Sequence, residues 1–229
     1  MNTHRKTAII VGVLFIIGTV TSSLYYVLVT PILDAPDYLV KVSENANQVI
    51  IGLLLYLIEG AAVVAIPIVL FPIFKKHNEA LALGYVASRM IETVTLVVGH
   101  ISLLALLTIS KEYGQAGALD ATHFQALGAS LLAVIDQSHL LGVEIVFALA
   151  ALILNYLLFR SKLVPRFISV WGLIGGILIL AEGLLGMFGL GPTSEMSIFS
   201  LIIAVQEMVF AVWLIGKGFN PSALASGSA

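Results

Sequence analysis

Long apolar runs separated by short polar segments dominate the hydrophobic pattern of this 229-residue chain. A helix that crosses a bilayer needs about 20 predominantly apolar residues, because the hydrocarbon core is about 30 Å thick. Six runs meet that length, and we expect them to span the membrane: 7–29, 49–74, 80–108, 137–159, 167–190 and 196–215. The pattern therefore predicts an all-α, polytopic transmembrane helix bundle with six spans.

Two of these runs raise a question: whether the first is a signal peptide, and where the fourth begins. The first is longer than the apolar region of about 7–15 residues in a signal peptide, so we expect it to be retained as a span. The fourth follows another apolar stretch, 124–135, which contains Gln125 and Ser130. That stretch is predicted to form either an interfacial half-helix leading into the span or a helix that projects beyond the membrane.

Composition supports a membrane protein and narrows the function classes. The chain is 59% hydrophobic and 10% charged, with a mean hydropathy of +1.06, whereas soluble domains have about 25% charged residues. That excludes a soluble globular enzyme, a disordered chain and a nucleic-acid-binding protein. The absence of cysteine excludes disulfides and thiolate metal sites. We expect one transmembrane domain over 1–219 and a flexible tail over 220–229.

The basic residues predict the orientation of the bundle, because cytoplasmic loops carry an excess of Lys and Arg. With the N-terminus inside, the cytoplasmic segments hold eight of the 11 basic residues and the outer loops hold only Lys41 and Lys111. The cytoplasmic set is Arg5, Lys6, Lys75, Lys76, Arg160, Lys162, Arg166 and Lys217. We therefore expect both termini to be cytoplasmic, in a multi-pass protein of the cell (inner or plasma) membrane.

Small and aromatic residues indicate how the spans pack and where they meet the interface. Gly172 and Gly176 have the four-residue spacing that lets helix backbones approach each other closely. Aromatic rings with a polar end favour the membrane–water boundary. We expect four of them to anchor the spans there: Trp171, Trp213, Tyr25 and Tyr26.

Ionisable residues inside the spans are the main functional signal. Each charge at mid-membrane costs about 2.5–3.5 kcal/mol on insertion scales, so such groups face the interior, pair or carry protons. The candidate cavity residues are Glu59, Arg89, Glu92, His100, Asp136, His139, Glu144, Glu182 and Glu207. Their formal charge is −5 with neutral histidines, which a low-dielectric site does not hold. Their depths converge on the mid-to-outer leaflet, which predicts one outward-open cavity that binds protons or cations.

Spacing assigns two pairs within this set. Arg89 and Glu92 are three apart on one helix face and are expected to form an ion pair. Asp136 and His139 have the same spacing, which resembles half of a helical metal site. A divalent metal held by these two residues is therefore a candidate cofactor, although the chain has no second such motif.

Several stretches together resemble a bacterial integral-membrane family known as domain of unknown function 4386. They are Glu-Asn-Ala-Asn at 44–47, Ser-Arg-Met-Ile-Glu at 88–92, His139 at the start of span four, and Asn-Tyr-Leu-Leu-Phe-Arg-Ser-Lys-Leu-Val-Pro-Arg at 155–166. The resemblance covers most of the chain and implies a six-span bundle without an assigned activity. It points to Arg89, Glu92 and His139, which the burial argument also selects.

Three function classes remain open from the sequence. The first is a protein that binds or transports a proton or cation, a lipid-like molecule or a small solute. The second is an intramembrane enzyme acting on a lipid-like substrate, with a metal at Asp136 and His139 or a haem between His100 and His139. The third is an accessory protein whose polar groups only specify helix packing. Membrane lipid is the expected partner in each case.

Overall fold

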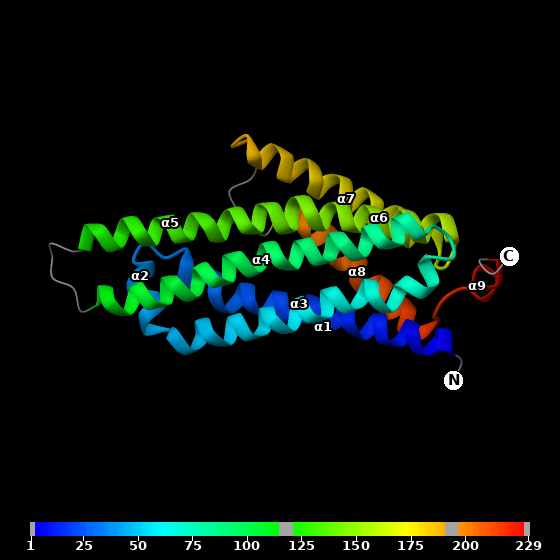
Figure 1. The fold of residues 1–229 in the computed structure, drawn as a ribbon, viewed down its shortest axis with the longest axis horizontal. Coiled ribbons are helices and arrows are strands. Elements are labelled where there is room, and N and C mark those ends of the chain that lie inside the picture. Colours follow the sequence, from blue (N-terminus) through cyan, green and yellow to red (C-terminus); the bar gives the residue numbers. More distant parts are fainter. Residues whose placement is uncertain (1–2, 115–120, 191–196, 227–229) are drawn as a thin grey trace.

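A computed structural model describes residues 3–114, 121–190 and 197–226 of the chain. Within these ranges the chain is almost entirely helical and contains no strand (Figure 1). In chain order the elements are α1 Thr3–Leu33, α2 Tyr38–Glu44, α3 Ala46–Phe74, α4 Glu79–Tyr113, α5 Ala121–His139, the π-helix η1 Leu140–Phe147, α6 Ala148–Ser161, α7 Arg166–Met187, α8 Ile198–Gly216 and α9 Pro221–Ser226. The predicted all-α class is confirmed.

Six of the helical segments are long and apolar enough to cross a membrane, which confirms the six-span architecture. They are Thr3–Leu33, Ala46–Phe74, Glu79–Tyr113, Ala121–Ser161, Arg166–Met187 and Ile198–Gly216. The segment 191–196, which includes the first residue of predicted span six, lies outside the described residues. The chain is a multi-pass membrane protein.

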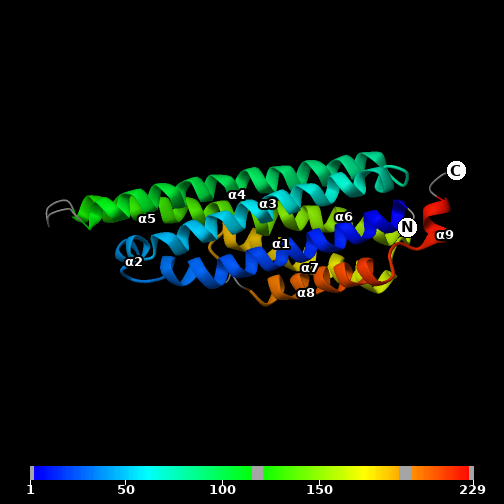
Figure 2. The same cartoon turned by 90° about the horizontal axis from the view of Figure 1, so that it is seen from below.

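The fourth span is longer than the predicted run because α5, η1 and α6 form one continuous helix of 41 residues. At 1.5 Å per residue it is about 60 Å long, roughly twice the thickness of the hydrocarbon core. Figures 1 and 2 show α5 lying beside α4, with both helices extending past the end of α1. The stretch 124–135 therefore fits the projecting helix and not the separate half-helix.

Apolar side chains cover the outside of the bundle, as lipid contact requires. Five apolar side chains along the spans have 61% to 70% of their surface exposed, a level unusual for large apolar side chains in soluble proteins. They are Val27, Leu57, Val94, Ile101 and Val212. Arg89, Glu92 and Glu182 are buried within the spans instead.

Two apolar clusters fill the ends of the bundle and leave the ionisable groups between them. One cluster, near the chain termini, contains Phe15, Phe74 and Phe210. The other, at the opposite end, contains Tyr25 and Tyr56. Tyr25 is 6% exposed, so the prediction that it anchors the membrane interface is wrong: its ring packs in the core.

Glycines set the closest helix contacts. A Cβ at Gly172 would overlap the Asn155 amide, and one at Gly176 would lie 3.0 Å from Leu152 Cδ2, so both face α6 as their spacing predicts. A Cβ at Gly12 would lie 2.7 Å from the Ala211 carbonyl oxygen. The α1–α8 contact therefore depends on glycine at position 12.

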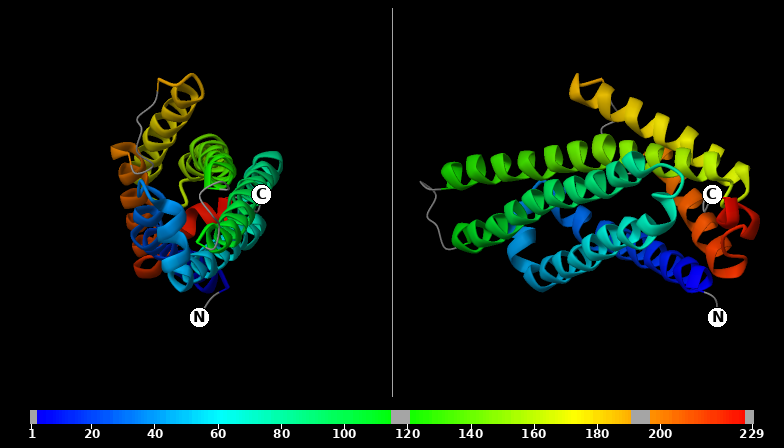
Figure 3. Two further views of the ribbon diagram at one scale, coloured as in Figure 1. Left: turned by 90° about the vertical axis from the view of Figure 1, so that its left-hand side faces the viewer. Right: turned by 45° about the vertical axis from the view of Figure 1, so that its right-hand side comes forward.

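Both ends of the described chain lie at the same end of the bundle (Figures 1 and 3). There the Arg5 guanidinium donates to the carbonyl oxygens of Leu214 at 3.0 Å, Ile215 at 2.5 Å and Gly216 at 3.2 Å. These carbonyls end α8 and have no partner within the helix, so Arg5 caps them from α1. The cytoplasmic location of this end remains a prediction from the charge bias.

Within the predicted tail, Pro221–Ser226 forms the short helix α9. The Asn220 side-chain oxygen accepts from the Ser222 backbone N–H at 3.2 Å, and the Asn220 N–H donates to the Leu163 carbonyl at 2.8 Å. These bonds tie the start of the tail to the α6–α7 connection. Residues 227–229 lie outside the described residues.

Candidate functional site

A cavity of about 320 Å³ lies in the middle of the bundle and is lined by residues of α1, α3, α4, α5, η1, α7 and α8. We call it the central cavity. Besides His139 at the end of α5, four of the ionisable candidates line it: Glu59 on α3, Arg89 and Glu92 on α4, and Glu207 on α8. The structure thus brings together residues that lie on three different spans.

Arg89 and Glu92 form the ion pair that their spacing predicts. Arg89 Nη1 donates to Glu92 Oε2 at 2.9 Å and to Oε1 at 3.2 Å, and both side chains are about 95% buried. The guanidinium carbon also lies 5.1 Å from the centre of the Phe147 ring, in a cation–π contact. One carboxylate therefore already neutralises the single guanidinium of the cavity.

Glu59 and Glu207 are left in excess of that pair. Neither makes an ion pair with another described residue, and Glu59 Oε2 is buried without a hydrogen-bond partner among the described residues. An unpaired buried carboxylate is strongly unfavourable, so each such group carries a proton or takes a cation. The central cavity therefore holds two carboxyls more than its single guanidinium pairs.

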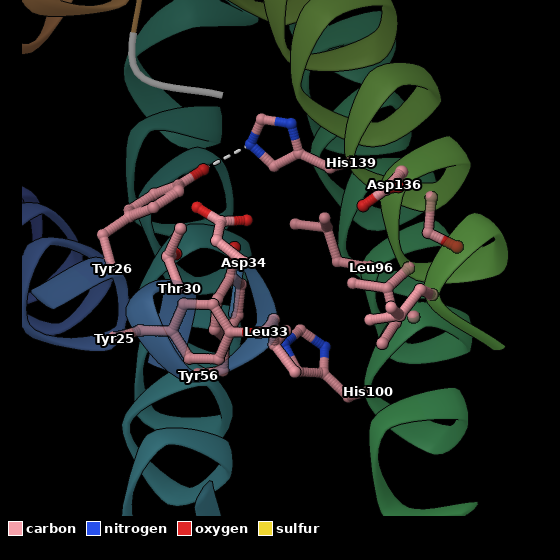
Figure 4. A pocket seen from close by; sticks show the side chains of 14 residues that line it. Tyr25, Tyr26, Thr30, Leu33, Asp34, Tyr56, Leu96, His100, Asp136 and His139 are labelled. Atoms are coloured by element: carbon pink, nitrogen blue, oxygen red, sulfur yellow. Dashed lines mark hydrogen bonds between the residues drawn. The ribbon is translucent and has the colours of Figure 1, made fainter. Parts of the chain in front are cut away.

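A second cavity of about 170 Å³, the outer cavity, lies toward the end of the bundle that carries α2 (Figure 4). His100 and His139 line it, together with the aromatic rings of Tyr25, Tyr26 and Tyr56. The His100 ring stacks on Tyr56 with a centroid distance of 4.0 Å. Two solvent-exposed carboxylates, Asp34 and Asp136, complete its ionisable lining.

Tyr26 and His139 stand between the two cavities. Their phenol oxygen and Nε2 share a hydrogen bond, drawn as a dashed line in Figure 4. Both residues line the outer and the central cavity, as does Tyr56. The pair therefore lies at a boundary that the two cavities share.

The π-helix η1 begins directly after His139. π-Helical segments are rare and occur frequently at functional sites. This one carries Phe147, which contacts Arg89, and Glu144, whose Oε1 lies 3.9 Å from His139 Nδ1. The irregular turn thus lies between the histidine at the outer cavity and the ion pair of the central one.

Glu144 and Glu182 line neither cavity. Glu144 packs against α7, where a Cβ at Gly183 would lie 2.9 Å from the Glu144 carbonyl oxygen. Glu182 Oε2 accepts from Ser197 Oγ at 2.6 Å, while its Oε1 is buried without a partner among the described residues. The predicted single cavity is therefore divided: four candidates line the central cavity, His139 lines both cavities, His100 and Asp136 line the outer one, and Glu144 and Glu182 lie beside them. Glu59, Glu92 and His100 also line a further pocket of about 230 Å³ between α3 and α4.

The donor set does not fit a metal or a haem well. No three His, Asp or Glu side chains of the described ranges are grouped so that they could hold a metal ion. Asp136 is exposed while His139 is buried, and His139 Nε2 is already bonded to Tyr26. The outer cavity between His100 and His139 is smaller than the roughly 300–1,000 Å³ of sites for drug-sized ligands.

Sequence reasoning missed three residues that shape these cavities. The sequence predicts Tyr26 at the membrane interface and singles out neither Asp34 nor Tyr56 as a site residue. A tyrosine near the end of a span has the same sequence signature whether it anchors the interface or bonds a buried histidine. Only the order of the helices around the bundle separates the two roles.

Comparison with known proteins gives a family and no activity. The sequence model of the family described as "Domain of unknown function (DUF4386)" matches residues 10–218. That range includes five spans in full, all but the first residues of α1, and every cavity residue named above. No curated protein and no solved structure matches the chain at a significant level.

Proposed function

Because the chain belongs to the DUF4386 family of domains of unknown function, a description that assigns no chemistry, we propose a function from the site itself: the protein binds a cation, a proton included, in the central cavity and transports it across the cell membrane. The observation that carries the proposal is the charge of that cavity. Glu59, Glu92 and Glu207 face one space with a single guanidinium, which Glu92 already pairs. The surplus carboxyls are the cation sites.

The outer cavity supplies the route to that site. Asp34 and Asp136 attract cations at its exposed lining, and negatively lined clefts raise the local concentration of positive ions. From there His139 and Tyr26 pass protons inward, because an imidazole and a phenol each both donate and accept a proton. Protons can move along this route while the Tyr26–His139 bond stays formed. A larger cation would pass only if the two side chains separated.

Two measurements on purified protein test the proposal. In proteoliposomes containing a pH-sensitive dye, a potassium diffusion potential should drive proton entry faster than in protein-free liposomes. In weakly buffered detergent solution, addition of sodium or tetramethylammonium chloride should release protons, because a bound cation displaces them from the carboxyls. Both readouts report the central cavity without requiring that its natural ligand be known.

Neutral isosteres of the surplus carboxyls provide the decisive variants. Glu59→Gln and Glu207→Gln should each lower both signals by at least about tenfold, since an intramembrane carboxyl that carries the ion is not replaced by an amide. Glu79→Gln is the matched control, because Glu79 is exposed at the start of α4. Wild-type protein with neither signal, or glutamine variants that retain both, would overturn the proposal.

A further inference from the structure

The central cavity is not closed toward the membrane on the side of α1 and α8. Near the termini these helices touch, with Gly12 against Ala211 and the Phe15 and Phe210 rings 5.3 Å apart. One turn further, Gly18 is buried, but a Cβ built there would find no atom within 4 Å. The two helices are therefore in contact at one end and separated by cavity space beyond it.

The cavity lining reaches the outer surface along this seam. It includes Ser23 and Val27 of α1 and Leu201 of α8. Val27 is 70% exposed and Leu201 52% exposed, so the same side chains face the cavity and the exterior. Neighbouring exterior positions on both helices are apolar, Val20 and Val205 among them, so the exterior at this seam is lipid.

The walls of the cavity have two characters. Apolar side chains dominate the lining, with Phe15, Ile66, Phe147 and Ile203 among them. The carboxyls form a separate polar region, supplied by α3, α4 and α8. A ligand that fits both regions of the wall carries a positive group and an apolar group. Binding pockets for small molecules commonly combine an apolar lining with few polar groups.

Hydroxyl groups mark the seam between the lipid and the carboxyls. Ser22 and Ser23 on α1 donate to the Thr19 carbonyl at 3.2 and 2.7 Å, which leaves the hydroxyl oxygens able to accept. Ser200 on α8 lines the same cavity. Hydroxyl oxygens at an otherwise apolar seam lower the cost of moving a cationic group from lipid to the cavity.

We propose that the central cavity takes up a lipophilic organic cation, an amine or quaternary ammonium group attached to an apolar chain or ring, from the membrane through the seam between α1 and α8. This assignment rests on the proposed cation site and names its substrate class. The ammonium group binds between Glu59 and Glu207, and the apolar group lies against the Phe15 and Ile203 walls. Protons reach the same carboxyls through the outer cavity, so uptake of the organic cation is coupled to release of protons.

Two probes that share one headgroup test the assignment. Octyltrimethylammonium and tetramethylammonium carry the same charge and differ in the apolar chain. Binding to the protein in lipid nanodiscs, beyond binding to protein-free nanodiscs, should be at least about tenfold tighter for the octyl compound, because its chain leaves water for the apolar wall. Equal affinities would overturn the substrate class.

A glycine pair locates the apolar group. Gly18→Leu adds a side chain into the open space of the seam, and Gly216→Leu is the matched control, since a Cβ at Gly216 also meets nothing within 4 Å. Gly18→Leu should weaken binding of the octyl probe by at least about tenfold and leave proton release by tetramethylammonium unchanged. An unaltered octyl affinity in Gly18→Leu would contradict the seam.

Single cysteines give a readout that does not depend on filling the cavity, because the natural chain has none. Leu201→Cys lies in the lining, and Val212→Cys is an equally lipid-facing control on α8 outside it. The octyl probe should slow N-ethylmaleimide labelling of Leu201→Cys but not of Val212→Cys. Equal labelling with and without the probe would overturn entry at the seam.

If tetramethylammonium also releases no protons from wild-type protein, the cation site itself fails. If that signal persists, only the lipophilic substrate fails.

Discussion

Tyr26 and His139, which are 113 positions apart in the sequence, share a hydrogen bond at the boundary of two intramembrane cavities. The bond links α1 to the last residue before the π-helix. Tyr26, Tyr56 and His139 are the described ionisable side chains that line both cavities, and the Tyr56 ring packs against His100. The hydrogen-bonded pair therefore lies at a boundary that the two cavities share.

Removing the Tyr26 hydroxyl should interrupt proton entry. Tyr26→Phe keeps the ring and deletes the bond to His139, so the potential-driven proton flux should fall by at least about tenfold, because the pair loses one of its two proton-transferring groups. Proton release by tetramethylammonium at equilibrium should not change, because the central carboxyls are intact. Tyr156→Phe, on the lipid-facing surface, is the control. A normal flux in Tyr26→Phe would contradict the relay.

The Arg89–Glu92 pair should be strongly coupled. Arg89→Met leaves a buried carboxylate unpaired and should cost about 3–5 kcal/mol of unfolding free energy. Adding Glu92→Leu removes the orphaned charge, so the double variant should recover most of that loss. A double-mutant cycle, measured by denaturant titration in detergent micelles, gives the coupling directly. Additive losses would mean that the two side chains do not depend on each other.

Close approach of the π-helix to α7 depends on Gly183. Gly183→Val places a Cβ against the Glu144 backbone and should destabilise the protein by about 1–3 kcal/mol, the usual cost of overpacking. Thermal unfolding in detergent measures the change. Gly216→Val adds the same side chain where no atom is within reach and serves as the control. Equal melting temperatures for the two variants would show that η1 tolerates displacement.

Arg5 should contribute to the α1–α8 contact. Arg5→Ala removes three hydrogen bonds to the carbonyls that end α8, and bonds from a charged donor contribute about 1.5–3 kcal/mol each when they are buried. Partial solvent access at this end reduces the expected total to about 2 kcal/mol. Arg5→Lys should retain less than half of the stabilisation that Arg5 contributes, because one ammonium group does not span three carbonyls. Denaturant titration of both variants measures the two losses of unfolding free energy.

Metal analysis should separate transport from metal-dependent catalysis. The donor geometry at Asp136 and His139 leads us to expect less than about a tenth of an equivalent of transition metal per chain after purification without chelator, since dedicated sites retain their metal. Elemental analysis provides the number. A stoichiometric metal that Asp136→Asn removes would restore the enzyme hypothesis.

The spans and the Arg89–Glu92 pair were predictable because both depend on local spacing. Bilayer thickness fixes the length of an apolar run, and three residues along a helix place two side chains on one face. The division into two cavities was not predictable, because it depends on which helices are neighbours. The sequence gives the depth of each ionisable group along the membrane normal, and these depths fall in a common zone. It does not give the position of each group around the bundle.

The position of Phe147 relative to His139 depends on a further feature that hydropathy does not report. A π-helix has i→i+5 hydrogen bonds, so it changes the angular position of every residue that follows. The apolar sequence of η1, Leu140–Phe147, has no residue that marks this change. The same limitation applies to α9, whose start depends on the Asn220 side chain bonding to Ser222 and was predicted as a flexible tail.

The Arg5 cap on α8 also has a consequence for biogenesis. The first span leaves the ribosome with a guanidinium whose acceptors belong to the last span, and Glu92 precedes Glu207 by about a hundred residues. At about 5–20 residues per second, roughly ten seconds of translation separate these two walls of the cavity, and roughly 10–40 seconds separate Arg5 from its acceptors. The cavity is therefore completed only after α8 has been synthesised, when α1 is already in the membrane.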